Sequence, residues 1–73
     1  MRVIVDLKKD EAETAVRKLE ALGFVADEGH AAPKPHDRDP GLCRVAGEVP
    51  LQRLHDLQLT WGVVTWHIAE MAA

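Results

Sequence analysis

Hydrophobic residues repeat at two different periods along the chain. Residues 2–7 alternate, so that Val3, Val5 and Leu7 share one side, which predicts a β-strand. Residues 10–22 instead repeat at i, i+3, i+4 and i+7, which predicts an amphipathic helix. Asp10 is placed to cap this helix, and Gly23 to end it.

Four further segments complete the pattern. Residues 23–28 and 42–49 predict short strands, and residues 61–71 predict the last strand. Pro50 suits the first turn of a second helix, which carries a leucine stripe. Residues 30–41 hold three of the four prolines and predict a loop, because proline cannot donate to a central strand.

The predicted order is β-α-β-β-α-β over a single domain, residues 1–73. Two right-handed crossovers and one hairpin place four strands in one antiparallel sheet. Both helices then cover the same face of that sheet. The sequence therefore predicts an α+β fold of the ferredoxin-like sandwich class.

Composition narrows the function classes. Apolar residues make up 47% of the chain and charged residues 29%, which is typical of a soluble globular domain. The net charge of −3 has no concentrated basic patch, so we expect no nucleic-acid partner. No apolar run approaches the roughly 20 residues that span a bilayer, so no membrane association is expected. The single cysteine and the short N-terminal apolar run favour a cytoplasmic bacterial-type protein.

The segment "HAAPKPHDRDPGLCRV" contains the residue types that bind metals. His30, His36 and Cys43 are the candidate ligands, together with nearby aspartates. A zinc site needs closely spaced pairs that one rigid turn can hold, whereas this spacing is irregular. We therefore expect no metal and no cofactor, and a solvated hairpin loop with incidental histidines. A metal- or small-ligand-binding regulatory domain stays open as an alternative.

The chain offers little for catalysis. It has no serine and no tyrosine, and no G-x-G-x-x-G or P-loop motif. Cys43 and a histidine could form a nucleophile–base pair, but no local motif supports one. So small a domain also has little room for a pocket that excludes water. We expect a protein that is not an enzyme.

The last predicted strand divides its side chains between the two faces of the sheet. Trp66 is expected under the helices, which places Val63, Thr65 and His67 on the open face with Ile4. Val45 is a further candidate for this face. An apolar patch of this kind commonly marks a protein–protein contact. We therefore predict a partner-binding face, used for a protein partner or for self-association as a homodimer.

The second half of the chain, "LCRVAGEVPLQRLHDLQLTWGVVTWHIAE", resembles the last β-α-β unit of subtilisin propeptides and the small protease inhibitors of propeptide type. The resemblance covers residues 42–70. It implies a ferredoxin-like fold whose open sheet face docks on a subtilisin-type serine protease. It also implies an inhibitory tail that lies in the protease active site, formed by Glu70, Met71, Ala72 and Ala73.

Together these observations predict a small non-enzymatic protein–protein interaction module that binds through its open sheet face. The alternative is a propeptide-like inhibitor of a subtilisin-type protease.

Overall fold

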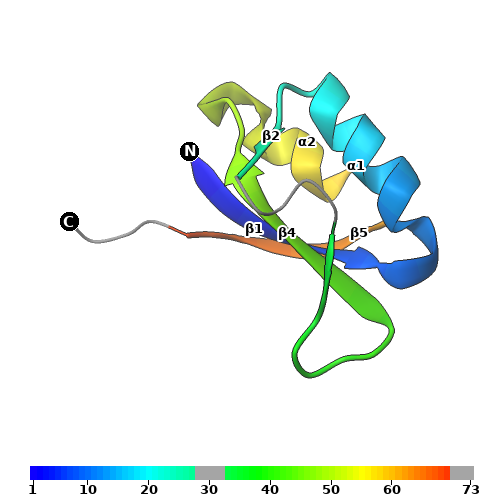
Figure 1. Ribbon diagram of the computed structural model, residues 1–73. Helices are drawn as coiled ribbons and strands as arrows, with labels where there is room; N and C mark the ends of the chain where they lie inside the picture. The colour runs from blue at the N-terminus through cyan, green and yellow to red at the C-terminus, as the bar shows by residue number, and fades with distance from the viewer. Residues whose placement is uncertain (28–32, 70–73) are drawn as a thin grey trace.

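The computed structural model describes residues 1–27 and 33–69 of the chain. The protein has a mixed α+β architecture (Figure 1). Its strands are β1 (Arg2–Lys8), β2 (Val25–Ala26), β3 (Lys34–Pro35), β4 (Leu42–Glu48) and β5 (Val63–Ile68). Its helices are α1 (Ala12–Ala21) and α2 (Leu54–Gln58), each preceded by a 3-10 turn, Lys9–Glu11 and Leu51–Arg53. No helix in this part of the chain is long and apolar enough to cross a membrane.

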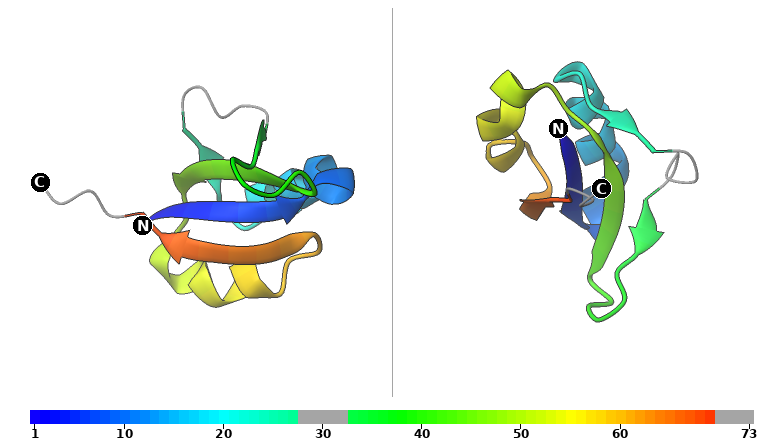
Figure 2. Two further views of the ribbon diagram at one scale, coloured as in Figure 1. Left: turned by 90° about the horizontal axis from the view of Figure 1, so that it is seen from below. Right: turned by 90° about the vertical axis from the view of Figure 1, so that its left-hand side faces the viewer.

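The strands form one antiparallel sheet in the order β2-β4-β1-β5. β1 lies between β4 and β5, so the first strand of the chain pairs with the two long strands of the second half (Figure 2). Within residues 1–27 and 33–69 the sheet has five strands, where the sequence predicted four. The additional strand is β3, which lies within the predicted loop and pairs with β4.

The pairing of β3 is compatible with its proline. β3 and β2 both lie along the outer edge of β4, at opposite ends, with Lys34 opposite Arg44 and Val25 opposite Glu48. A proline is tolerated at such an edge because its missing N–H interrupts no ladder on the outer side. The predicted exclusion of Pro35 from a central strand is thus consistent with the structure, but the length assigned to the loop was too great.

Both helices pack on one face of the sheet and bury its apolar side chains (Figure 1). Val3, Val5 and Leu7 are at most 1% exposed and form the sheet side of the core. Leu19 of α1 and Leu57 of α2 are fully buried against them. The alternation in residues 2–7 and the stripe of the first helix therefore predicted their core residues correctly, whereas Leu51, in the predicted stripe of the second helix, is 63% exposed. Among the described residues, the buried core consists of Val3, Val5, Leu7, Ala12, Ala15, Leu19, Phe24, Val45, Val49 and Leu57.

The C-terminal end of α1 matches the sequence prediction, and its N-terminal end does not. Gly23 follows the helix with a φ of 95°, a conformation that glycine adopts without strain. At the other end, a 3-10 turn precedes the helix and Glu11 occupies the cap position without a side-chain hydrogen bond. The predicted capping role of Asp10 is therefore wrong.

A register shift in β5 changes which of its residues face the helices. Asp6 lies opposite Thr65, whereas the next residue, Leu7, lies opposite Val63, so Val64 is an extra residue in the ladder. Such a bulge moves every side chain before it to the other face of the sheet. Val63 consequently packs against the core, and Val64 is 48% exposed.

Candidate functional site on the open face of the sheet

The face of the sheet away from the helices carries polar side chains over its two central strands. Asp6 of β1 lies opposite Arg44 of β4 on one side and Thr65 of β5 on the other. Ile4 lies opposite Ala46 and His67. Since side chains alternate between the two faces of a strand, these residues all lie opposite the helix-covered core.

Asp6 is the buried charged residue of this face, with 5% of its surface exposed. Arg44 Nε donates a hydrogen bond to Asp6 Oδ1 at 2.8 Å, and Arg44 Nη2 lies 3.5 Å from Asp6 Oδ2. The hydrogen bond to Asp6 and the negative charges of Asp6 and Asp37 raise the pKa of Arg44, against the lowering effect of burial. A buried carboxylate needs such partners because isolated burial of a charge is costly.

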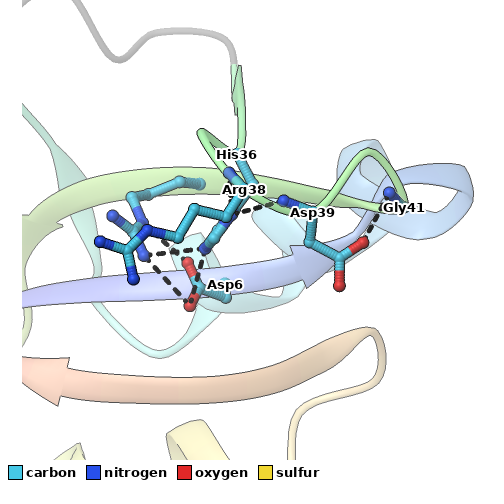
Figure 3. Close-up of polar contacts among 6 residues, drawn as sticks. Asp6, His36, Arg38, Asp39 and Gly41 are labelled. Carbon is cyan, nitrogen blue, oxygen red and sulfur yellow. Dashed lines mark hydrogen bonds and ion pairs between the residues drawn. The ribbon is translucent and has the colours of Figure 1, made fainter.

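His36 connects this ion pair to the turn that follows β3 (Figure 3). Its Nδ1 accepts hydrogen bonds from the backbone N–H groups of Arg38 and Asp39, at 3.0 and 3.1 Å. Its other ring nitrogen, Nε2, faces the ion pair. That Nε2 is 3.9 Å from Asp6 Oδ2 and 3.0 Å from Arg44 Nη2. Arg44 therefore links the other two side chains, because its guanidinium donates to the Asp6 carboxylate and also contacts the His36 ring.

The turn between β3 and β4 is closed by its own hydrogen bonds. The His36 N–H donates to the carbonyl of Leu42, and the Leu42 N–H donates to the carbonyl of Asp39. Asp39 Oδ1 accepts from the Gly41 N–H at 2.9 Å, the side-chain turn that aspartate favours (Figure 3). The segment that the sequence presented as a solvated loop is, over residues 34–41, a closed hairpin arm attached to the open face.

A hollow of about 370 Å³ lies where this arm meets the sheet. Its lining combines two histidines with both signs of charge, from the turn, β4 and β5: His36, Asp37, Arg38, Arg44 and His67. Such a lining offers hydrogen-bond donors and acceptors rather than an apolar pocket. The site can therefore hold polar or charged groups of another molecule.

A second ion pair lies at the far end of the same face. Arg2 of β1 forms two hydrogen bonds with the carboxylate of Asp27, which follows β2. Hydrogen bonding to Asp27, together with the negative charges of Asp27 and Glu48, raises the pKa of Arg2. The open face thus has an ordered ionic contact near each end, with Ile4 and Ala46 between them.

The structure brings together three of the four residues predicted for the partner-binding face. Ile4, Thr65 and His67 share the open face, and Ile4 and His67 are direct neighbours across β1 and β5. Val63 does not belong to it, because the bulge turns its side chain towards the core. Val45 is fully buried opposite Val5 on the helix side. The prediction of an apolar patch was wrong for these two valines, and the face is mainly polar.

The candidate metal ligands do not converge in the described part of the chain. His36 lies on the open face, whereas Cys43 lies opposite Leu7 on the helix-covered face. No group of three metal-binding side chains occurs among residues 1–27 and 33–69. His30 and the predicted tail, residues 70–73, lie outside the described residues.

Sequence reasoning missed the central members of this site. Asp6 and Arg44 were each assigned to a strand, but neither was singled out as functional. The available signal was a pair of opposite charges, each between two apolar residues of a strand, at positions that face away from the core. His36 was interpreted as incidental. Its role could not be predicted, because the two backbone contacts of its ring form only when the turn is closed.

Comparisons with known proteins give no relative. No family model matches the chain, and no curated protein or solved structure matches it either.

Proposed function

We propose that this chain is a small, non-enzymatic protein–protein interaction module that binds a partner protein through the open face of its sheet. The observation that supports this proposal most directly is the hydrogen-bonded cluster of Asp6, Arg44 and His36 beside the polar hollow. Side chains that are already ordered lose little entropy on binding, which favours recognition. The partner surface that fits this face supplies hydrogen-bonding side chains for the hollow and a small apolar contact for Ile4.

We further propose that the fold is a ferredoxin-like sandwich whose second strand is interrupted. In this interpretation β2 and β3 are the two ends of one edge strand. Their pairing with the same edge of β4, in the same antiparallel sense, supports this assignment. The order β2-β4-β1-β5 and the two helices on one face agree with it.

The test compares two exposed threonines, one on the open face of the sheet and one on a helix of the other face. Thr65 is exposed on the open face and Thr14 is exposed on α1. Thr65→Arg is expected to abolish capture of a partner that the unaltered protein retains from lysate of its source cells, because a long cation covers the contact surface. Thr14→Arg is expected to leave capture unchanged. Equal capture by both variants would show that the open face is not the binding surface.

A propeptide-like inhibitor of a subtilisin-type protease is the second candidate. The sheet order and the two helices on one face support it, since the resembling family has this topology. In that case equimolar protein inhibits a subtilisin-type protease, and deletion of residues 71–73 abolishes inhibition. Full protease activity in the presence of excess protein excludes this candidate and leaves the interaction module unaffected.

A further inference from the structure

The two outer edges of the sheet differ sharply in how well they are protected. The β2 and β3 edge consists of two-residue strands and carries Lys34 and Pro35. Short strands, lysine and proline are the devices by which proteins prevent further strands from adding to an edge. The opposite edge is formed by the six residues of β5, VVTWHI, which include no charged residue, proline or glycine.

The outer side of β5 is unpaired within the described structure. β5 pairs with β1, and no other described strand contacts it in the sheet. Figure 2 shows β5 running along the margin of the sheet with α2 behind it, on the helix-covered face. Val64 and Ile68 are 48% and 47% exposed there. An edge of this kind is a template for another strand.

The hydrogen-bond pattern determines which residues of β5 offer free backbone groups. The Ala69 N–H donates to the Arg2 carbonyl at 3.0 Å. Bonded pairs alternate along an antiparallel ladder, so His67 and Thr65 also direct their N–H and C=O groups towards β1. Trp66 and Ile68 consequently direct theirs outwards. A partner strand must therefore satisfy the backbone groups of these two residues.

We propose that two copies of this chain associate through their β5 edges, antiparallel and around a twofold axis at His67. In this register Trp66 lies opposite the partner subunit's Ile68, and Ile68 opposite the partner subunit's Trp66. All the outward backbone groups of the two residues are then bonded. A register centred on Trp66 places Ile68 opposite the bulge residue Val64 of the second copy, and one centred on Ile68 places Trp66 opposite a position beyond the end of β5. The His67-centred register instead pairs Trp66 and Ile68 with each other.

The proposed dimer also buries apolar surface on the helix-covered side. Trp66 is half-buried on the core and Ile68 is half-exposed, and both lie on this side of the sheet. Pairing them across the axis covers the exposed part of Ile68 with an aromatic ring, a cross-strand combination that stabilises sheets. A symmetric contact of this type closes at two copies, because each chain has one such edge. The two sheets become one continuous sheet.

The register can be tested with single cysteines in a Cys43→Ser background. Directly opposite residues that are not hydrogen-bonded lie about 4.5 Å apart at their Cα atoms, a separation that a disulfide can bridge. His67→Cys is therefore expected to give a covalent dimer when the thiol oxidant diamide is added. Thr65→Cys, whose two copies lie about 13 Å apart in this register, is expected to stay monomeric on a non-reducing gel. Equal cross-linking of both variants overturns the proposal.

Sedimentation equilibrium tests the association itself. The unaltered protein is expected to reach twice the 8.1 kDa mass of one chain as its concentration rises. Ile68→Pro removes an outward N–H without interrupting the bonds to β1, and Ile68→Lys places a charge on the edge. Both are expected to remain monomeric with unchanged circular dichroism. Val25→Lys, at an exposed apolar position of the opposite edge, is the matched control and should still dimerise.

A monomer at every concentration overturns the assignment of a second copy to this edge. Loss of the dimer in Val25→Lys together with its retention in Ile68→Pro also overturns it. These outcomes are separate from partner capture, which depends on the Thr65 side of the sheet.

Discussion

At the scale of single residues, His36 joins local chain geometry to the charged cluster of the open face. Its ring replaces a backbone acceptor in the turn and at the same time places Nε2 beside the Asp6–Arg44 pair. The exposed His55 of α2 has no such contacts in the described structure, although the two residues look equivalent in the sequence. The difference lies in the tertiary position and not in the residue type.

Removal of the His36 ring should loosen the turn. His36→Ala loses two hydrogen bonds to backbone N–H groups, so we expect a loss of about 1 kcal/mol in the free energy of unfolding. The amides of Arg38 and Asp39 should exchange faster, as measured by NMR. His36→Asn should recover part of the protection, because an asparagine oxygen accepts the same type of bond. His55→Ala is the control, and an effect of equal size there contradicts the assigned role.

The Arg44–Asp6 pair should contribute more to stability than a surface ion pair. Arg44→Gln leaves Asp6 without its charged partner, and we expect a loss of about 1–2 kcal/mol in urea denaturation. This value is reduced from that of a fully buried pair because the Arg44 side chain is 34% exposed. Arg53→Gln disrupts an i,i+3 pair whose arginine is 51% exposed, and should change stability by less than about 0.5 kcal/mol.

The raised pKa of Arg44 also determines how its contribution to the free energy of unfolding changes with pH. A cation whose pKa is raised in the folded state stabilises the fold at all pH values below its unfolded pKa, and loses this effect only as the pH rises through the folded value. For arginine this range lies above about pH 12. The stability difference between the protein and Arg44→Gln should therefore be the same at pH 8 and pH 10. A difference that shrinks over this interval would contradict a charged arginine as its source.

At the scale of elements, the bulge in β5 is the feature that made the sequence prediction of its faces wrong. A strict period of two from Ile68 back to Val63 places Val63 on the open face, and one inserted residue reverses that assignment. No glycine marks the bulge in residues 63–65, so the sequence carries little local signal for it. The turn that precedes it supplies the constraint, because Lys8 N–H is bonded to the Gly62 carbonyl.

Two adjacent valines test the bulge directly. Val63→Asp introduces a charge against the core and should destabilise the protein by about 2 kcal/mol or more. Val64→Asp changes a half-exposed side chain and should cost less than about 0.5 kcal/mol. Thermal or urea unfolding of the two variants measures the difference. A larger loss of stability in Val64→Asp than in Val63→Asp would contradict the bulge and favour simple alternation.

The contact between β2 and β4 depends on a residue without a side chain. A Cβ on Gly47 would lie 2.3 Å from the Val25 carbonyl oxygen and 2.7 Å from Phe24 Cζ. Gly47→Ala must push β2 away from the sheet, so we expect a loss of about 1–3 kcal/mol. Gly41→Ala meets only the Asp39 side chain, at 3.3 Å, and serves as the control with little change in the unfolding midpoint. Equal stability of both variants would show that β2 adjusts freely.

At the scale of the whole molecule, the sheet should be most stable at its centre. β1 is bonded on both sides, by β4 and β5, and its apolar face is buried. We therefore expect the amides of Val3, Val5 and Leu7 to exchange only through global unfolding. The amides of the two-residue strands β2 and β3 should exchange much faster. Uniform exchange across the sheet, measured by NMR, would contradict this ranking.

The sequence predicted the overall architecture better than the site. The two periodicities are local properties, and they were sufficient for β1, α1 and the core residues of these two elements, whereas Val45 of β4 was expected on the open face and is buried. The site instead depends on long-range register, which places Asp6 beside Arg44 and closes the His36 turn over them. β3 could not be predicted because two residues with a proline have no strand signal of their own. Pairing with β4 determines their conformation.

The central position of β1 also bears on how the protein is made. Val3 pairs with Ile68 and with Gly47, so both neighbours of β1 lie in the second half of the chain. A ribosome therefore releases the most buried strand long before its partners exist. Contacts between such distant residues form slowly, because the intervening chain must first be closed into a loop. We expect nascent chains that end before residue 63 to lack a stable fold, and folding to follow completion of β5.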